Sequence, residues 1–180
     1  YQSIDFSNKN LSSKEFRNCI FKSCKFLKTN LGSTQFVECK FARCGFAENN
    51  LENTSLKDIK FEDCEITGEC FSRINSFLLS ISFKKCQINR CDFSEIDLSS
   101  TIFKKCMIRD THFVKTNLTG SNFSGSDLNR SVFQDSNLTE SDFTGAINYS
   151  IDPTSNRVKK AKFTQPEVIS LLKCFDIVIE

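Results

Sequence analysis

A large apolar residue recurs at every fifth position along most of this chain. From Phe6 to Phe71, and again from Phe83 to Phe143, every fifth residue is Phe, Leu or Ile without exception. This period matches neither the 3.6 residues of a helical turn nor the two-residue alternation of a flat strand. Each five-residue step must therefore turn the chain and return one large apolar side chain, the centre of the step, to a shared interior.

The cysteines show a second period, of 20 residues. Cys24, Cys44 and Cys64 are 20 residues apart, and each stands two positions before a centre, where small residues prevail. Four steps therefore make one coil, which predicts a solenoid with four faces. The frame slips by two residues within 72–82, and Cys86 follows Cys64 by 22. We expect a bulge there that keeps the coils on both sides in phase.

Centres one coil apart should stack into ladders inside the solenoid. One predicted ladder contains Phe21, Phe41, Phe61, Phe83, Phe103, Phe123 and Phe143. A second contains Leu11, Leu31, Leu51, Phe71, Phe93, Phe113 and Phe133. The remaining positions of each step are mostly Lys, Glu, Asn, Ser and Asp, which should face water.

Many steps share a short motif. Clear copies are Thr29-Asn30-Leu31, Thr116-Asn117-Leu118, Ser126-Asp127-Leu128 and Ser136-Asn137-Leu138. These resemble the A(D/N)LXX motif of pentapeptide-repeat proteins, with Ser, Thr or Cys standing where the motif has Ala. The resemblance implies an all-β fold, a right-handed quadrilateral β-helix over residues 1–150 that includes the slip. It is followed by a short C-terminal helix in a capping and dimerisation segment, residues 151–180.

The C-terminal segment resembles one group within that family, the Qnr proteins and the albicidin- and microcin-immunity proteins. The similar stretches are Asn148–Pro153, Ala161–Glu167, Leu171–Leu172 and Asp176–Ile179. The resemblance implies a non-enzymatic resistance or immunity protein that binds DNA gyrase or topoisomerase IV and protects it from a topoisomerase poison. It also implies a homodimer joined through the C-terminal segment and a rod that imitates DNA. The alternative is a structural or scaffold protein with an unrelated protein partner.

Qnr proteins commonly carry projecting loops between coils that matter for quinolone protection. Here the only break is the slip from Ser72 to Ser82, with two extra residues. A bulge is therefore expected rather than a long loop, and protection from a peptide-like toxin rather than from a quinolone.

Charge is nearly balanced, with 24 Lys and Arg against 22 Asp and Glu and a net charge of +2. A general nucleic-acid binder is usually distinctly basic, so we expect no direct contact with nucleic acid. A DNA mimic needs acidic surface, so mimicry here would depend on a limited acidic strip. The candidate strip consists of Asp97, Asp127, Asp135 and Asp142. No apolar run could span a bilayer and no signal peptide is visible, so we expect no membrane contact.

The tail predicts a helix with a capping box and one apolar face. Thr164 is placed to cap the first turn, and Glu167, three residues later, to reach back. The apolar face consists of Val168, Leu171, Leu172 and Phe175. This face is expected to cover the last coil, to contact a second copy of the chain, or to do both. Asp176–Glu180 is expected to form a short strand.

The ten cysteines raise two chemical possibilities, metal binding and disulfides. Eight of them stand two positions before a centre as inward fillers, without the close pairs that zinc sites use. Stacked Cβ atoms one coil apart would be ~4.8 Å apart, beyond the ~3.5–4.5 Å of a disulfide. We therefore expect free structural thiols, no metal or other cofactor, and a reducing cytoplasm.

No pattern points to catalysis. His112, the only histidine, is expected at the surface, the six glycines form no phosphate loop, and no two acids stand out as an acid–base couple. We therefore expect no catalytic residues. One further cluster, Lys84, Lys85, Lys104 and Lys105, should stack into a basic patch. The patch either alternates with acids one coil below on a solvated face or contacts an acidic or phosphate-bearing partner.

Overall fold

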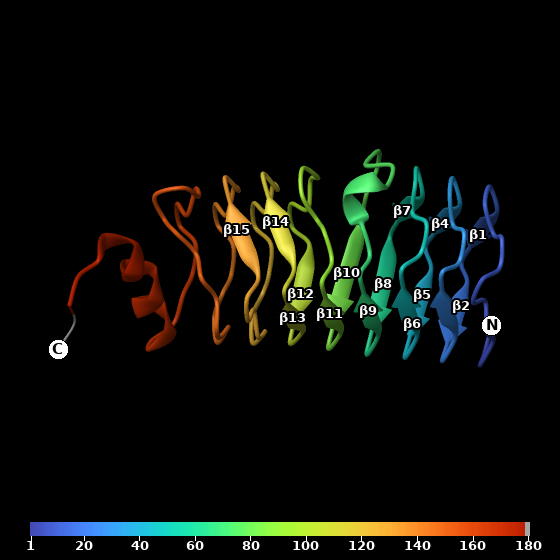
Figure 1. Ribbon diagram of the computed structural model, residues 1–180, viewed down its shortest axis with the longest axis horizontal. Helices are drawn as coiled ribbons and strands as arrows, with labels where there is room; N and C mark the ends of the chain where they lie inside the picture. Colours follow the sequence, from blue (N-terminus) through green and yellow to red (C-terminus); the bar gives the residue numbers. More distant parts are fainter. Residues whose placement is uncertain (179–180) are drawn as a thin grey trace.

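Residues 1–178, which the computed structural model describes, wind into a four-sided parallel β-helix (Figure 1). The N-terminus lies at one end of the column, and the chain advances coil by coil to the C-terminal helix at the other end. The winding is right-handed. The all-β quadrilateral helix predicted from the five-residue period is confirmed. No helix in this part of the chain is long and apolar enough to cross a membrane.

Short parallel strands pair with strands one coil away and build sheets along the column. One sheet contains β1 (Glu15–Arg17), β4 (Gln35–Val37) and β7 (Ser55–Lys57). The next contains β2 (Ile20–Lys22), β5 (Lys40–Ala42), β8 (Ile59–Glu62), β10 (Ile81–Lys84) and β12 (Ile102–Lys104). A third contains β3 (Lys25–Leu27), β6 (Gly45–Ala47), β9 (Glu65–Thr67), β11 (Gln87–Asn89) and β13 (Met107–Arg109). The fourth contains β14 (His112–Val114) and β15 (Val132–Gln134).

The predicted ladders of centres form the core. From Phe21 through Phe103, successive rings of the first ladder stack with their centroids 4.7–5.2 Å apart. Rings on opposite faces meet edge to face across the interior, as Phe83 meets Phe93 at 5.9 Å and 78°. Stacked and edge-to-face contacts are the two arrangements that the charge distribution of aromatic rings favours. A column only one ring wide on each side is therefore filled without voids along most of its length.

The small residues two positions before each centre do more than fill space. Thr34 Oγ1 donates a hydrogen bond to the carbonyl of Leu11, in the coil below, at 2.8 Å. In the opposite sense, the backbone N–H of Cys106 donates to Ser126 Oγ at 2.9 Å. These side chains satisfy backbone groups that turn inward at the corners, where the strand pairing stops. That explains why Thr, Ser and Cys occupy the position more often than Ala.

The slip leaves the coils in phase, as predicted. The strand β8 pairs with β10 so that Phe61 lies opposite Phe83. Cys86 Sγ donates to the carbonyl of Phe61, the same contact that Cys64 Sγ makes to Phe41 one coil earlier. The extra residues are absorbed by the 3₁₀ turn η1 (Phe71–Arg73) and the bulge that follows it.

Coil stacking continues beyond residue 150. Isolated bridges join Asn137 to Arg157 and Asp142 to Lys162. The ring of Phe163 stacks on Phe143 with centroids 5.1 Å apart. The 3₁₀ helix η2 (Glu167–Phe175) then lies across the end of the column (Figure 1). An open end of a β-helix exposes unpaired backbone groups, and this helix covers them.

Candidate interaction surfaces

The cysteines belong to the core. Seven of the ten are buried, namely Cys24, Cys39, Cys44, Cys64, Cys86, Cys91 and Cys106, and all ten are free. Burial raises the pKa of Cys91 to about 12. A hydrogen bond with Cys106, with burial added, raises the pKa of Cys86 to about 12. The thiols of Cys86 and Cys91 therefore stay protonated at neutral pH and are poor nucleophiles. Within residues 1–178, no three His, Cys, Asp or Glu side chains are grouped so that they could hold a metal ion.

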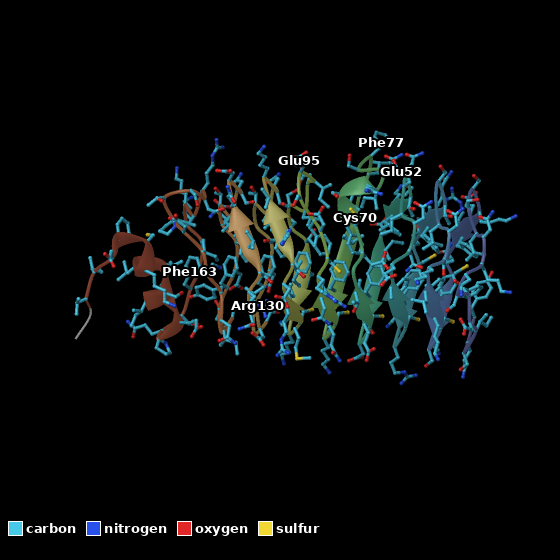
Figure 2. All side chains as sticks on the ribbon, viewed as in Figure 1. Glu52, Cys70, Phe77, Glu95, Arg130 and Phe163 are labelled. Atoms are coloured by element: carbon cyan, nitrogen blue, oxygen red, sulfur yellow. The ribbon has the colours of Figure 1, made fainter. Side chains whose placement is uncertain are left out.

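The bulge at the slip presents two apolar side chains to solvent. Phe77 is 74% exposed and Leu78 is 57% exposed, and Figure 2 shows Phe77 at the outer edge of the column. Asn75 Oδ1 accepts a hydrogen bond from the backbone N–H of Phe77 at 2.9 Å, which fixes the turn. The next residue, Leu79, packs partly against the core. The sequence predicted the bulge but not this exposed pair. Two adjacent apolar residues that do not occupy centre positions of the repeat could have indicated apolar side chains outside the core.

The four aspartates of the predicted strip do not lie together. Asp97 is in one bridged column with Asn117, Asp127 is in a second with Met107, and Asp142 is in a third. Asp135 occupies a corner, in the left-handed conformation with φ 53°. The reason is the four-step coil, because residues stack on one face only when they are a multiple of one coil apart. The structure therefore contains no single acidic strip made of these four residues.

Three of these carboxylates are used locally. Asp97 Oδ1 accepts from the backbone N–H of Ser99 at 2.8 Å, which is the hydrogen bond of an Asx turn. Asp142 does the same with the residue two positions later. Burial opposes ionisation of Asp127, but hydrogen bonds from Asn148 and Arg109 outweigh it and hold its pKa below the usual value. These groups build corners and link coils, and their role as partner contacts stays a prediction.

The predicted capping box of the C-terminal helix is wrong. The helix η2 begins after Pro166 with no side-chain cap. Thr164 Oγ1 instead accepts from the N–H of Gly145 at 2.9 Å, and Glu167 Oε1 accepts from the N–H of Asn148 at 2.6 Å. Both acceptors are taken by backbone donors that the last coil leaves unpaired, where there is no further coil to bind them. The two side chains fasten the tail to the column rather than to the helix itself.

The predicted apolar face of this helix is divided between two environments. Leu171 packs against the core, and Val168 is half-buried. Phe163, which also packs against the core, lies where the column meets the helix (Figure 2). Leu172 and Phe175 are 39% and 55% exposed. The face therefore covers the last coil with one part and faces solvent with the other.

The outward side of the tail carries more apolar surface than the sequence indicated. Ile169 and Ile177 are exposed beside Leu172. An open groove is lined by Pro166, Glu167, Ile169, Ser170, Leu172, Lys173 and Ile177. The helix ends at Phe175. The next residue, Asp176, has the left-handed conformation with φ 50°, and Asp176–Val178 do not form the predicted strand. The last two residues of the predicted strand, Ile179 and Glu180, lie outside the described part of the chain.

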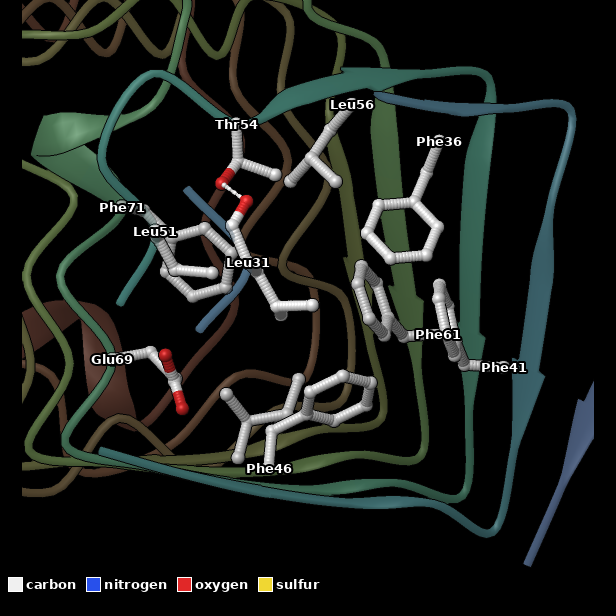
Figure 3. Close-up of a pocket in the computed structure, with 11 residues that line it drawn as sticks. Leu31, Phe36, Phe41, Phe46, Leu51, Thr54, Leu56, Phe61, Glu69 and Phe71 are labelled. Atoms are coloured by element: carbon white, nitrogen blue, oxygen red, sulfur yellow. Dashed lines mark hydrogen bonds between the residues drawn. The ribbon is translucent and has the colours of Figure 1, made fainter. Parts of the chain in front are cut away.

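One acid is buried inside the column. Glu69 stands two positions before the centre Phe71, a place that small residues hold in most other steps, and it is 2% exposed. Its side chain points into a cavity of about 20 Å³, otherwise lined mostly by Phe, Leu and Ile (Figure 3). Glu69 Oε2 has no hydrogen-bond partner. Burial raises the pKa of Glu69 to about 7, against hydrogen bonds from Asn49 that lower it.

Two further predictions concern charged and polar surface residues. Lys84 lies opposite Lys104 in the pairing of β10 with β12, and Lys85 and Lys105 follow at the same corner. The predicted stacking of these lysines is confirmed. His112 is exposed on β14, as expected. Its outward neighbours in the strand pairing are Val132 and Asp92.

Comparisons with known proteins identify one family. The family model of the pentapeptide repeat region matches residues 14–76 and 73–143. A trypsin-treated variant of QnrB1, a plasmid-mediated fluoroquinolone resistance protein, has a TM-score of 0.63 at 15% identity, with 99% of each chain covered. Another trypsin-treated QnrB1 variant gives 0.49 at 18% identity, covering 98% of this chain and 99% of that one. HetL, a protein involved in heterocyst differentiation regulation in the cyanobacterium Nostoc, has a TM-score of 0.28 at 14% identity. The match covers 90% of this chain and 88% of HetL. No curated protein sequence matches the chain.

Proposed function

The chain belongs to the pentapeptide-repeat family, and from that premise we propose that it is a non-enzymatic resistance or immunity protein that binds DNA gyrase or topoisomerase IV and protects it from a poison. The observation that carries the proposal is the extent of the fold shared with QnrB1, which includes the C-terminal segment as well as the coils. The stretches of this segment that resemble the immunity proteins point the same way. Fold alone does not fix function, so the proposal needs a direct test.

A column of this kind acts by presenting a surface. Every coil is hydrogen-bonded to the next, and stacked side chains fill the interior, so the backbone positions from which the outer side chains project are fixed. A rigid surface loses little conformational entropy when a partner binds. The exposed pair Phe77 and Leu78 is the apolar contact that such a surface offers near the middle of the column. We infer that this pair contacts the topoisomerase.

A homodimer is part of the proposal. The exposed side chains Ile169, Leu172 and Ile177 lie at the end of the column, on the outward side of the tail. Two copies joined there would bury this surface and lengthen the rod. All ten cysteines are free, which suits the reducing cytoplasm, where these topoisomerases work.

The proposed activity is tested with purified gyrase and topoisomerase IV. Supercoiling, decatenation and cleavage-complex formation are measured with a peptide-like poison and with a quinolone, at rising concentrations of this protein. We expect protection from the peptide-like poison. Replacing Phe77 and Leu78 with Ser should reduce protection, whereas the matched replacement of the exposed Leu27 and Ile147 with Ser should not.

The alternative is a scaffold with an unrelated protein partner, and the near-neutral charge of +2 favours it, because a DNA mimic would be acidic. It predicts no binding to either topoisomerase and no rescue from any poison. That outcome would reject the proposed function.

A further inference from the structure

One face of the column collects lysines. The sheet β2–β5–β8–β10–β12 runs along the column (Figure 1). Its outward side chains form two rows in register, here called the lysine face. The first row is Lys22, Ala42, Glu62, Lys84 and Lys104. The second row is Ile20, Lys40, Lys60, Ser82 and Ile102. Each of the five strands therefore contributes one lysine, and Glu62 is the only acid among them.

Most of this positive charge is unpaired. Lys40 Nζ lies 2.6 Å from Glu62 Oε2. The hydrogen bond from Lys40 lowers the pKa of Glu62, and the nearby charges of Lys84 and Lys60 act in the same direction. Across residues 1–178, the other lysines of the face, Lys22, Lys60, Lys84 and Lys104, form no ion pair.

The corner beside β10 and β12 extends the basic surface. Lys85 and Lys105 occupy it in the left-handed conformation, both with φ 55°, and both are exposed. Arg43 and Asp63 occupy the same corner in earlier coils. Together, the lysine face and this corner carry eight basic side chains and two acidic ones, a net charge of +6 in a chain whose total is +2.

The opposite border of the lysine face is less basic. Glu38 and Asp58 stand at the corner beside β5 and β8. They offset part of the charge of Lys40 and Lys60. The strongest positive surface is therefore centred on β10 and β12, around Lys84 and Lys104.

We propose that the lysine face binds the sugar–phosphate backbone of a nucleic acid duplex without reading its sequence. Strands in a sheet are ~4.8 Å apart, so the five lysines span roughly 19 Å along the column. One strand of a B-form duplex carries a phosphate every ~3.4 Å, or about six over that length. The five ammonium groups, which are divided between the two rows, thus supply a charge comparable to that of the duplex phosphates that face this length of the column.

The side chains of the face favour a duplex over other anionic partners. Lysines are depleted in the cores of protein–protein interfaces, which use aromatic residues and Arg. Single-stranded nucleic acid is bound through aromatic side chains on which bases stack, and no outward residue of the five strands is aromatic. Lysine is a point charge that contacts phosphate without the paired hydrogen bonds with which Arg reads guanine. What the face offers is backbone contact alone.

This inference goes beyond the proposed function and does not depend on it. The total charge of +2 predicted no nucleic-acid contact, but it averages over four faces. A protein that bound both a topoisomerase and the duplex held by that enzyme would use two different surfaces, the exposed pair at the slip and the lysine face.

The test measures binding of the full chain to a fluorescently labelled duplex of about 30 base pairs. The readout is fluorescence anisotropy, at salt concentrations between about 50 and 200 mM. The variant K84Q/K104Q/K105Q removes three charges from the basic surface. We expect it to bind about tenfold more weakly or worse, and the slope of log K against log salt to fall by about 3, one for each lost phosphate contact. Wild type should prefer the duplex to oligo(dT) of equal length and should not distinguish duplex sequences.

The matched control is K57Q/K115Q/K159Q, which removes the same charge from other faces. Lys57 and Lys115 reproduce the positions of Lys104 and Lys105, one in a strand and one at a left-handed corner with φ 53°. Equal losses in the two variants would show that total charge alone matters and would overturn the proposal. Tighter binding to oligo(dT), to acidic polypeptide or to anionic vesicles than to the duplex would also overturn it. Gyrase protection does not enter this assay, so the two proposals fail separately.

Discussion

Asn49 donates two hydrogen bonds to one carboxylate oxygen of Glu69, from its backbone N–H at 3.2 Å and from its side-chain amide at 2.7 Å. The second oxygen, Oε2, has no partner and faces the apolar cavity. In the same inward position one coil below, the Asn49 amide also donates to the carbonyl of Phe26. A carboxylate cannot make that donation, so Glu69 interrupts the pattern of inter-coil hydrogen bonds in the coil next to the slip.

Stability should therefore depend on pH through Glu69. The unfolded chain loses this proton near pH 4.5, whereas the folded chain keeps it until about pH 7. Folding takes up a proton between these values, so the contribution of Glu69 to the free energy of unfolding is greatest below pH 4.5 and falls as pH rises to about 7. The fall should be about 3 kcal/mol. Urea titrations at several pH values measure it.

Glu69→Gln should remove most of this fall and stabilise the protein above pH 7, because the amide carries no charge and can donate as Asn49 does. The control is Glu52→Gln, since Glu52 is exposed in the preceding coil. An unchanged pH dependence in the Glu69 variant would contradict the assignment.

Phe103→Ala should destabilise the column by ~3–5 kcal/mol. The ring is fully buried between Phe83 and Phe123, with centroids 5.1 and 4.8 Å away, and the stacked coils leave little freedom to close a cavity. The neighbouring Ile102 is 46% exposed, so Ile102→Ala should cost less than about 0.5 kcal/mol. Equilibrium denaturation compares the two. Similar losses for both variants would mean that the register of this strand is wrong.

Leu172→Glu should convert a dimer into monomers, because an interface that buries this side chain would bury an unpaired charge. Val132→Glu is a matched control, since Val132 is also 39% exposed but lies in β15, away from the tail. Analytical ultracentrifugation at micromolar concentration measures the association. A monomeric wild-type protein under these conditions would remove the dimer from the proposal.

Thiol reactivity should separate the cysteines by burial. In the native protein, Cys174 should react first with an aromatic disulfide reagent at about pH 8, because it is exposed in the tail. The half-buried Cys19 and Cys70 should follow slowly, and the buried seven should react only in denaturant. Cys174→Ser should abolish the fast phase. Rapid modification of a buried thiol in the native state would indicate that coils open locally.

The sequence by itself determined the architecture. The period of five fixed which side chains enter the core, and the 20-residue spacing of Cys24, Cys44 and Cys64 fixed four steps per coil. Both follow from local geometry, since every step repeats the same turn and every coil contacts only its neighbours. For the same reason, Cys64 and Cys86 could be placed in one column across the slip, and Lys84 could be placed beside Lys104.

Only the tertiary structure decided what the irregular residues do. Thr164 and Glu167 have the spacing of a capping box, but they bind the N–H groups of Gly145 and Asn148, because the end of the column leaves those donors unpaired. Such contacts join residues that are 19 or more positions apart, and no local period specifies them. The net charge of the whole chain gave no sign of the lysine face. Coil stacking brings residues one coil apart onto the same face, so one face can be strongly basic while the chain as a whole is nearly neutral.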